Sequence, residues 1–252
     1  MAYYPIFLEL RDRRCLVIGG GREAQRKVAG LLAAGGDVTV VSPKLTRELQ
    51  RLLAEGEIAL EQRAYRDGDL EGYDVCMVAT DDGAVNAQVA AEGKRRRVWV
   101  NAADDPKNCD FILPAVIRRG SVTLAASTGG ASPALARRLR EELEAYLTEE
   151  MPALAELLAE VRSDLRPRGI APDADVWQEA IDEELRVLLA QRKYKQAKAR
   201  LLQSLGAGEL VPELVGADVG TGLQTRPRGV ADGAEAPSLR APSISAPLRR
   251  SS

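Results

Sequence analysis

A run of three glycines, Gly19 to Gly21, follows a short apolar segment and precedes a segment with helical periodicity. Gly19, Gly21 and Ala24 have the spacing G-x-G-x-x-A. In a strand–turn–helix unit, the first glycine allows a tight turn and the second lets the backbone approach a pyrophosphate, while the small third residue lets helix and strand pack closely. The pattern predicts a dinucleotide-binding loop in which Gly20 is the least constrained glycine. A plain glycine turn is the alternative.

The ends of two further apolar segments carry polar residues that could contact the same ligand. Dinucleotide sites usually have an acidic residue after the second strand to hold the ribose, but here that position is near Ser42, with Lys44 close by. The motif therefore leaves the choice between NAD and NADP open. The full set of predicted cofactor-binding residues is Gly19, Gly21, Arg22, Glu23, Ser42, Pro43, Thr80 and Asp81. The alternative for the acidic pair 81–82 is capping of the next helix.

A second polar cluster follows the fifth apolar segment. Asn101, Asp104 and Asp105 come just after it, and ligands of open α/β sheets bind at the carboxyl ends of the strands. The chain has no histidine, so proton transfer must use another side chain, and a carboxylate at this edge is the leading candidate for the general base. The alternative is that both aspartates form a turn before Pro106.

These residues need an alternating β/α scaffold. Apolar runs at 14–18, 38–41, 58–62, 74–80 and 97–101 predict strands, and helical stripes are expected at 22–34 and 83–95. Continuous apolar strands separated by helices are typical of a parallel sheet that is buried on both faces. We therefore predict a Rossmann-like, doubly wound α/β fold with its ligand at the carboxyl edge of the sheet.

The pattern changes after residue 110. Two strands joined at Arg119-Gly120-Ser121 predict a hairpin, and Ser132 and Pro133 suit the N-cap and first position of a helix with leucines at 135, 139, 143 and 147. Further amphipathic helices are expected at 151–165 and 175–205, with Gly206 as the stop. We predict an NAD-binding domain at 1–113, a small α+β dimerisation region at 114–148, a helical domain at 149–206 and a disordered tail at 207–252.

Composition narrows the class of protein. A net charge of −2 and few aromatic residues argue against nucleic-acid and membrane partners. Cys15, Cys76 and Cys109 form no CxxC pair, so neither a disulfide framework nor a metal site is predicted, and we expect small buried residues in strands. No signal peptide or membrane-spanning run is recognisable, which leads us to expect a cytoplasmic protein.

Four ordered motifs together resemble the precorrin-2 dehydrogenase family, the module that also forms the N-terminal part of siroheme synthases. The motifs are PIFLELRDRRCLVIGGGREAQRK, VATDD, VNAADDPKNCDFILPA and ASTGGASPALARRLREELE. The resemblance extends from about residue 5 to 147 and more loosely to 206. It implies NAD-dependent oxidation of the tetrapyrrole precorrin-2 to sirohydrochlorin on a homodimer built through the region after the nucleotide domain.

The resemblance also implies roles for individual residues. The family's key aspartate corresponds to Asp104 through the N-x-x-D-x-P-K context, and its loop of hydroxyls and glycines corresponds to Ser127, Thr128, Gly129 and Gly130. We expect Asn101 and Lys107 to contact the substrate as well. The substrate carries several carboxylates, which suit arginine; the nearby candidates are Arg118, Arg119, Arg137 and Arg138, although the last two could instead pair with Glu141 and Glu142.

Three questions stay open at this level. The family contains members that only dehydrogenate and members that also insert ferrous iron (ferrochelatase, a lyase), and we place dehydrogenation alone slightly ahead. A different nicotinamide-dependent oxidoreductase would use the same glycine loop. A non-catalytic, dimeric Rossmann module that senses NAD is the third alternative.

Overall fold

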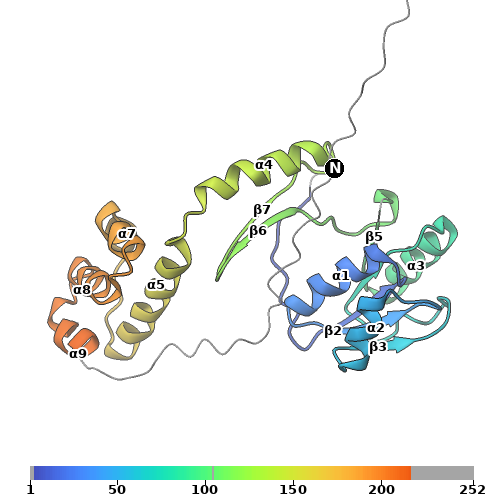
Figure 1. Ribbon diagram of the computed structural model, residues 1–252, viewed down its shortest axis with the longest axis horizontal. Helices are drawn as coiled ribbons and strands as arrows, with labels where there is room; N and C mark the ends of the chain where they lie inside the picture. Colours follow the sequence, from blue (N-terminus) through green and yellow to red (C-terminus); the bar gives the residue numbers. More distant parts are fainter. Residues whose placement is uncertain (1–2, 104, 217–252) are drawn as a thin grey trace, which may run out of the picture. The chain divides into compact units, whose positions relative to one another are not determined.

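The computed structural model describes residues 3–103 and 105–216. Its N-terminal part contains a parallel five-stranded sheet with strand order β3-β2-β1-β4-β5 (Figure 1). This is the Rossmann-like sheet that the apolar runs predict. The strands are β1 Arg14–Ile18, β2 Asp37–Val41, β3 Ile58–Glu61, β4 Val75–Val78 and β5 Trp99–Ala102.

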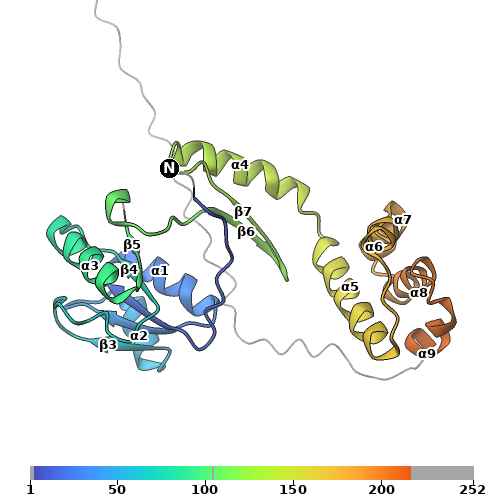
Figure 2. The same cartoon turned by 180° about the vertical axis from the view of Figure 1, so that it is seen from behind.

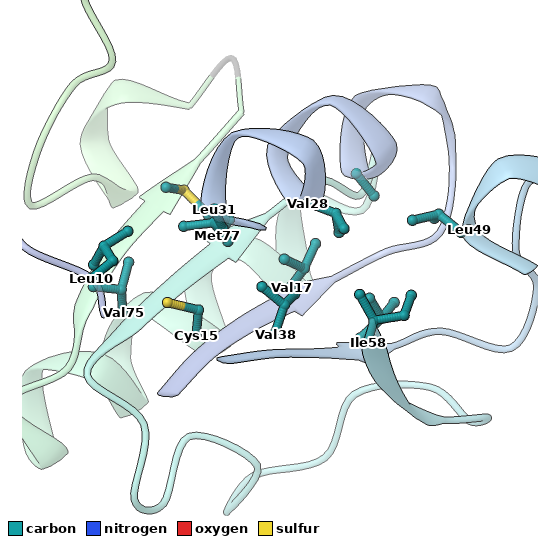
Figure 3. Packing of buried hydrophobic residues seen from close by; sticks show 12 residues of the cluster. Leu10, Cys15, Val17, Val28, Leu31, Val38, Leu49, Ile58, Val75 and Met77 are labelled. Carbon is teal, nitrogen blue, oxygen red and sulfur yellow. The ribbon is translucent and has the colours of Figure 1, made fainter. Parts of the chain in front are cut away.

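Both faces of the sheet are covered, as the continuous apolar strands require. Alternate residues of β1 point to opposite faces, so Cys15 and Val17 lie in one core cluster while Leu16 and Ile18 lie in another. The first cluster packs under helix α1 (Arg22–Ala33) and is seen in Figure 3, where Val28 and Leu31 point at the strands. The second packs under helix α3 (Gly83–Arg96).

The strand order places the ends of β1 and β4 side by side. From β1 the chain passes through α1 to β2 and then β3, whereas β4 lies on the other side of β1 and leads to β5. Such a reversal of direction opens a crevice at the carboxyl edge of an α/β sheet, which is the usual ligand site. The glycine loop lies at this point.

A short helix, α2 (Arg47–Ala54), was not predicted. Its N-cap is Thr46, whose hydroxyl accepts a hydrogen bond from the Leu49 N–H at 3.3 Å. Its apolar residues, Leu49, Leu52 and Leu53, pack on the core of the sheet. The sequence signal was present in the N-cap threonine and the leucine spacing, although eight residues are few for a periodicity argument.

The predicted hairpin is present as β6 (Ala115–Arg119) and β7 (Val122–Ala126), paired antiparallel. Helix α4 (Pro133–Tyr146) contacts both strands and runs beside them (Figure 1). Ser132 is its N-cap, accepting from the Leu135 N–H at 3.1 Å, and Pro133 is its first residue, as predicted. No residue of α4 is buried, and Leu135 of the predicted leucine stripe is 51% exposed.

The following helices have a hydrophobic core of their own. Helix α5 (Met151–Leu165) packs with α7 (Glu183–Ala190) and α8 (Tyr194–Ser204), as Figure 2 shows, and α6 (Ala174–Ala180) contacts α8. The segment predicted as 175–205 is thus three helices. Asp182 separates two of them because its carboxylate accepts from the Leu185 N–H at 2.8 Å.

The predicted tail begins too early. Residues 208–210 form a 3-10 turn and α9 (Val211–Gly216) follows, with Leu210, Val211 and Leu214 packed on the helical core. These apolar residues explain the error, because low complexity begins only after them. The rest of the predicted tail, 217–252, lies outside the described residues. The domain boundaries given above stay predictions.

Cys15 and Cys76 are buried in strands, as expected, whereas Cys109 is half-buried in a loop. Across residues 3–103 and 105–216, no helix is long and apolar enough to cross a membrane.

Candidate dinucleotide site

Gly19 is required by the close approach of two strand ends. Its φ is +117°, and a Cβ atom built on it would lie 2.3 Å from the carbonyl oxygen of Ala79, the residue after β4. Its N–H donates to the carbonyl of Val41 at the end of β2, at 3.0 Å. Three neighbouring strands therefore meet at this residue, and only glycine fits there.

The other two glycines differ in the space around them, and only Gly20 departs from its prediction. Gly20 is crowded, because a Cβ atom there would lie 2.0 Å from the Lys44 carbonyl oxygen and 2.6 Å from Ser42 Oγ. Gly21 has no atom within 4 Å of that position. The prediction that Gly20 is the least constrained glycine is wrong: Gly20 packs against the loop after β2, and it is Gly21 that faces open space, as a pyrophosphate contact requires.

This contrast gives a paired prediction. Gly20→Ala should lower the free energy of unfolding by about 3 kcal/mol, because backbone must move to make room. Gly21→Ala should leave stability nearly unchanged but weaken NAD binding roughly tenfold or more, because its methyl group occupies the ligand's space. Chemical denaturation and calorimetric NAD titration measure the two effects. Equal destabilisation by both substitutions would contradict this assignment.

The N-terminus of α1 is open for an anion. Gly21 is its N-cap and no described side chain caps it. Arg22 is exposed, and Glu23 accepts from Arg26 at 2.8 Å. Unpaired N–H groups at a helix N-terminus bind phosphate through their partial positive charge. A dinucleotide therefore fits this turn, with Arg22 available and Glu23 partly neutralised.

The loop after β2 is fixed by its own hydrogen bonds. Ser42 is buried, and its hydroxyl donates to the Lys44 carbonyl at 2.7 Å. The Thr46 N–H donates to the Gly20 carbonyl at 3.0 Å, which ties the loop to the glycine turn. Pro43 is exposed beside it. The Ser42 hydroxyl thus shapes the loop, and its predicted contact with a ribose stays a prediction.

The segment after β4 combines a turn with a helix cap. Thr80 Oγ1 accepts from the Asp82 N–H at 2.9 Å, and Asp82 caps α3 by accepting from the N–H groups of Ala84 and Val85. Asp81 is exposed beside the cap. One turn into α3, the buried Oδ1 of Asn86 has no hydrogen-bond partner among the described residues. A buried acceptor without a partner fits an edge at which a ligand supplies N–H groups.

Asn101 is held from inside the protein. It is 7% exposed; its Oδ1 accepts from Lys27 Nζ at 2.9 Å, and its Nδ2 donates to the Phe111 carbonyl at 2.9 Å. The side chain predicted to bind substrate therefore has partners already. Asp104, the predicted base, lies outside the described residues. The carboxylate of Asp105 accepts from Asn108 Nδ2 at 2.7 Å, as a turn former does.

Burial raises the pKa of the Cys109 thiol, and the positive charge of Lys27 acts in the opposite direction. The sulfur accepts from the Ala102 N–H at 3.2 Å and lies 3.1 Å from the Ala102 carbonyl and 3.3 Å from that of Asp105. The thiol therefore keeps its proton at neutral pH and can donate it to either carbonyl, which closes the loop that follows β5.

The other predicted substrate residues lie in two loops. Lys107 is exposed in the 3-10 turn Pro106–Asn108. The turn between β7 and α4 holds the remaining four, and Thr128 fixes it by donating to the Ser132 carbonyl and accepting from the Ser132 N–H. Ser127 Oγ accepts from the Gly129 N–H at 3.1 Å, and the positive φ angles of Gly129 and Gly130, +63° and +87°, explain the glycines.

The structure thus gathers the predicted cofactor residues and Asn101 at one edge of the sheet, and it gathers Ser127 to Gly130 in a separate turn. Lys27 was missed by the sequence reasoning. Its signal was a lysine within the apolar stripe of helix 22–34, three residues after Ala24 and one before Val28. Within the described ranges, no group of three or more Cys, Asp or Glu side chains could hold a metal ion.

Comparison with known proteins supports a nucleotide-binding domain followed by a second conserved segment. Residues 6–115 match an NAD(P)-binding family model, and residues 119–146 match the model of the central part of sirohaem biosynthesis proteins. The solved structure of SirC, a precorrin-2 dehydrogenase, aligns with a TM-score of 0.65 and 30% identity over 79% of this chain and 100% of SirC. The chain belongs to the precorrin-2 dehydrogenase family. Its Rossmann-like parallel sheet matches that of SirC, and the NAD(P)-binding family model supports NAD as the cofactor.

Curated relatives of this family member are longer proteins. The siroheme synthase of Methylococcus capsulatus is 40% identical over 209 residues, which are 82% of this chain and 44% of that protein. The siroheme synthase of Nitrosococcus oceani is 38% identical over 227 residues, 87% of this chain and 48% of that protein. The chain therefore spans a little under half the length of these relatives.

Proposed function

We propose that the chain oxidises precorrin-2 to sirohydrochlorin with NAD, as a step in the formation of siroheme. The observation that carries the proposal is the glycine turn at the reversal point of the sheet, where Gly19 is forced by the Ala79 carbonyl and Gly21 is left open. The reaction removes two electrons and two hydrogens from the substrate. One hydrogen would leave as hydride, for which bound NAD would supply the acceptor, and the other as a proton to a base.

The protein's part is to hold and orient the two reactants. The N–H groups at the start of α1 would bind the pyrophosphate, with Arg22 beside them. NAD, when bound, supplies the hydride acceptor. Thr80 and Asp81 follow β4, where the nicotinamide half of the ligand would lie. Holding the hydride donor and the hydride acceptor in contact is the main catalytic contribution of such a site.

The base that we propose is Asp104, on the basis of its sequence context. Its neighbours in the chain are held: the Ala103 N–H donates to the Val78 carbonyl at 2.9 Å, and Asp105 is fixed by Asn108. A carboxylate at this edge can accept the substrate proton as hydride leaves.

The substrate's carboxylates need cationic partners. Arginines that already pair with a glutamate of the chain are the weaker candidates. Arg119 is paired with Glu149 at 2.9 Å and Arg138 with Glu142 at 2.7 Å. Arg118 and Arg137 are exposed and have no ion pair among the described residues, as is also true of Lys107. We therefore propose Arg118, Arg137 and Lys107, with the turn 127–130, as the tetrapyrrole contacts.

The proposed assembly is a homodimer formed through 114–148. A two-stranded hairpin is marginal by itself, and α4 has no buried residue while Leu135 and Tyr146 are 51% and 76% exposed. Leu135→Glu is expected to shift the protein from dimer to monomer in sedimentation velocity. Val187→Glu, at an exposed apolar residue of α7, is the matched control and should stay dimeric. A monomeric wild-type protein would refute the dimer.

A spectral assay of the full chain with precorrin-2 and NAD, with and without ferrous iron, tests the function. Formation of sirohydrochlorin with equimolar NADH is expected. Siroheme formation when iron is added would assign the chelatase step as well. NAD binding without any oxidation would favour the non-catalytic sensing module, and oxidation of other substrates alone would favour an unrelated dehydrogenase. The proposed location, the cytoplasm, rests on the sequence only.

A further inference from the structure

Lys27 is a buried cation between the cofactor helix and the loop that follows β5. Its side chain is 4% exposed, although it belongs to an otherwise amphipathic surface helix. Removing an ammonium group from water is costly and needs compensating polar contacts. Lys27 Nζ lies 2.9 Å from Asn101 Oδ1 and 3.9 Å from Glu23 Oε1. Because burying this ammonium group costs desolvation free energy, we infer that its hydrogen-bond donors have a role that an apolar side chain could not fill.

The task follows from the chemistry of the two groups. An ammonium group can only donate, so it fixes which end of the Asn101 amide faces α1. With Oδ1 turned to Lys27, Nδ2 must point the other way, where it donates to the Phe111 carbonyl. Lys27 and the Phe111 carbonyl thereby fix the orientation of the amide from its two ends, because the ammonium group can only donate and the carbonyl can only accept.

Asn101 is one of three links that clamp the two stems of this loop. The N–H of Val100 donates to Asp110 Oδ2 at 2.9 Å, and the Asp110 N–H donates to the Val100 carbonyl at 2.7 Å. Next comes the link from Asn101 to Phe111, and then the contacts of Cys109 with Ala102. The segment enclosed by these links, 103–108, includes sequence position 104.

We propose that Lys27 is a positioning residue: it locks the Asn101 amide and so holds the two stems of the loop after β5, residues 100–102 and 109–111, in register with the helix that binds NAD. This inference rests on the proposed function for its catalytic consequence, but its structural part does not. In this proposal Asn101 supports the loop through Lys27 and Phe111 and does not contact the substrate.

Lys27→Met should loosen the loop while leaving the sheet intact. Amide hydrogen exchange within 102–111 is expected to become about tenfold faster, with exchange in β1 and β2 unchanged. The kcat for precorrin-2 should fall about a hundredfold, because a small displacement of a reacting group has that effect. The KM for precorrin-2 and the Kd for NAD should stay within about twofold, since neither ligand contact is removed. Unchanged exchange in 102–111 would overturn the proposal.

Two matched variants sharpen the result. Arg26→Met removes a cation from the exposed face of the same helix and should change neither exchange nor kcat. Asn101→Asp keeps the acceptor for Lys27 and the side-chain shape but loses the donor to Phe111, so it should reproduce the faster exchange even if Lys27→Met does not fold. Protection of 102–111 in Asn101→Asp equal to that of the wild type would also overturn the proposal.

A double-mutant cycle tests whether Lys27 acts through Asn101. Lys27→Met should have little further effect on kcat in the Asn101→Asp background, because the link is already broken. Additive losses would show that Lys27 acts independently, which contradicts the proposal. If wild-type protein binds NAD but does not oxidise precorrin-2, the proposed function fails, while the exchange measurements still decide the role of Lys27.

Discussion

Asp104→Asn is expected to lower the kcat for precorrin-2 oxidation about a thousandfold, within the range that loss of a general base produces. The amide has nearly the same shape but cannot accept the substrate proton. NAD affinity should stay within about twofold, because the dinucleotide site is built from the glycine turn and α1. Stopped-flow measurement of NADH formation and calorimetric titration of NAD give the two quantities.

The neighbouring carboxylate provides the control. Asp105 is bound to Asn108 through a hydrogen bond of 2.7 Å, so Asp105→Asn should keep most of the activity. Unchanged turnover in Asp104→Asn would remove the catalytic assignment. Equal losses in the two variants would mean that the loop's fold, rather than one carboxylate, is responsible.

Glu92→Ala is expected to be strongly destabilising, with a loss of about 3–5 kcal/mol in the free energy of unfolding. Glu92 lies on α3 with 0% of its side chain exposed, and it accepts from Arg96 Nε at 2.7 Å. It also accepts from the N–H groups of Gly68 and Leu70, at 3.0 and 3.2 Å. Removing the carboxylate leaves the half-buried N–H of Gly68 and the buried N–H of Leu70 without their acceptor, and leaves Arg96 with only its exposed partner Glu71.

The same carboxylate also receives the hydroxyl of Tyr65 at 2.7 Å, and burial together with the Glu92 charge raises the pKa of Tyr65. The phenol therefore stays a donor at all ordinary pH values. Glu71→Ala is the matched control, since Glu71 is exposed and pairs with the same Arg96 at 3.3 Å. It should cost less than about 1 kcal/mol. Urea denaturation of both variants checks the difference, and a loss below about 1 kcal/mol for Glu92→Ala would contradict the expectation.

Glu92 stabilises the connection between β3 and β4, which lies wholly within the described residues and contains no helix. Between β3 and β4 the described chain has turns at 62–74 and no helix, so no regular hydrogen-bond ladder satisfies its backbone. The carboxylate from α3 supplies acceptors for that segment instead. This role could not be predicted from sequence, because a glutamate within a helix is most often solvated. Its backbone partners, Gly68 and Leu70, are more than 20 residues away in the chain.

Predictions from sequence worked where the signal was local. The apolar run of β1, the glycine spacing and the Ser132-Pro133 start of α4 each determine their own structure within a few residues. They worked less well where the answer depended on distant backbone. The crowding of Gly20 is due to the carbonyl of Lys44, and one of the two contacts that orient Asn101 comes from Lys27, 74 positions earlier. Periodicity carries no information about such contacts.

The site divides in the same way. The positions of Gly19, Gly21 and Thr80 at one sheet edge follow from strand order, which the pattern of strands and helices predicts. The commitment of Ser42 and Thr128 hydroxyls to their own loops does not follow, since a hydroxyl in a loop sequence can bind backbone or ligand equally well. For these residues the family resemblance indicates their position in the chain but not their hydrogen-bond partners.

The loop after β2 has a consequence for changing the enzyme's cofactor. Its shape is maintained by the glycine turn, by the buried Ser42 hydroxyl and by the bond from Thr46 to Gly20, all of them independent of the exposed side chains of Pro43 and Lys44. The Lys44 side chain can therefore be varied without disturbing this frame, whereas substitutions at Pro43 also release the φ angle that its ring fixes. A library limited to 43 and 44 is the most economical route to a variant with altered discrimination against a 2′-phosphate.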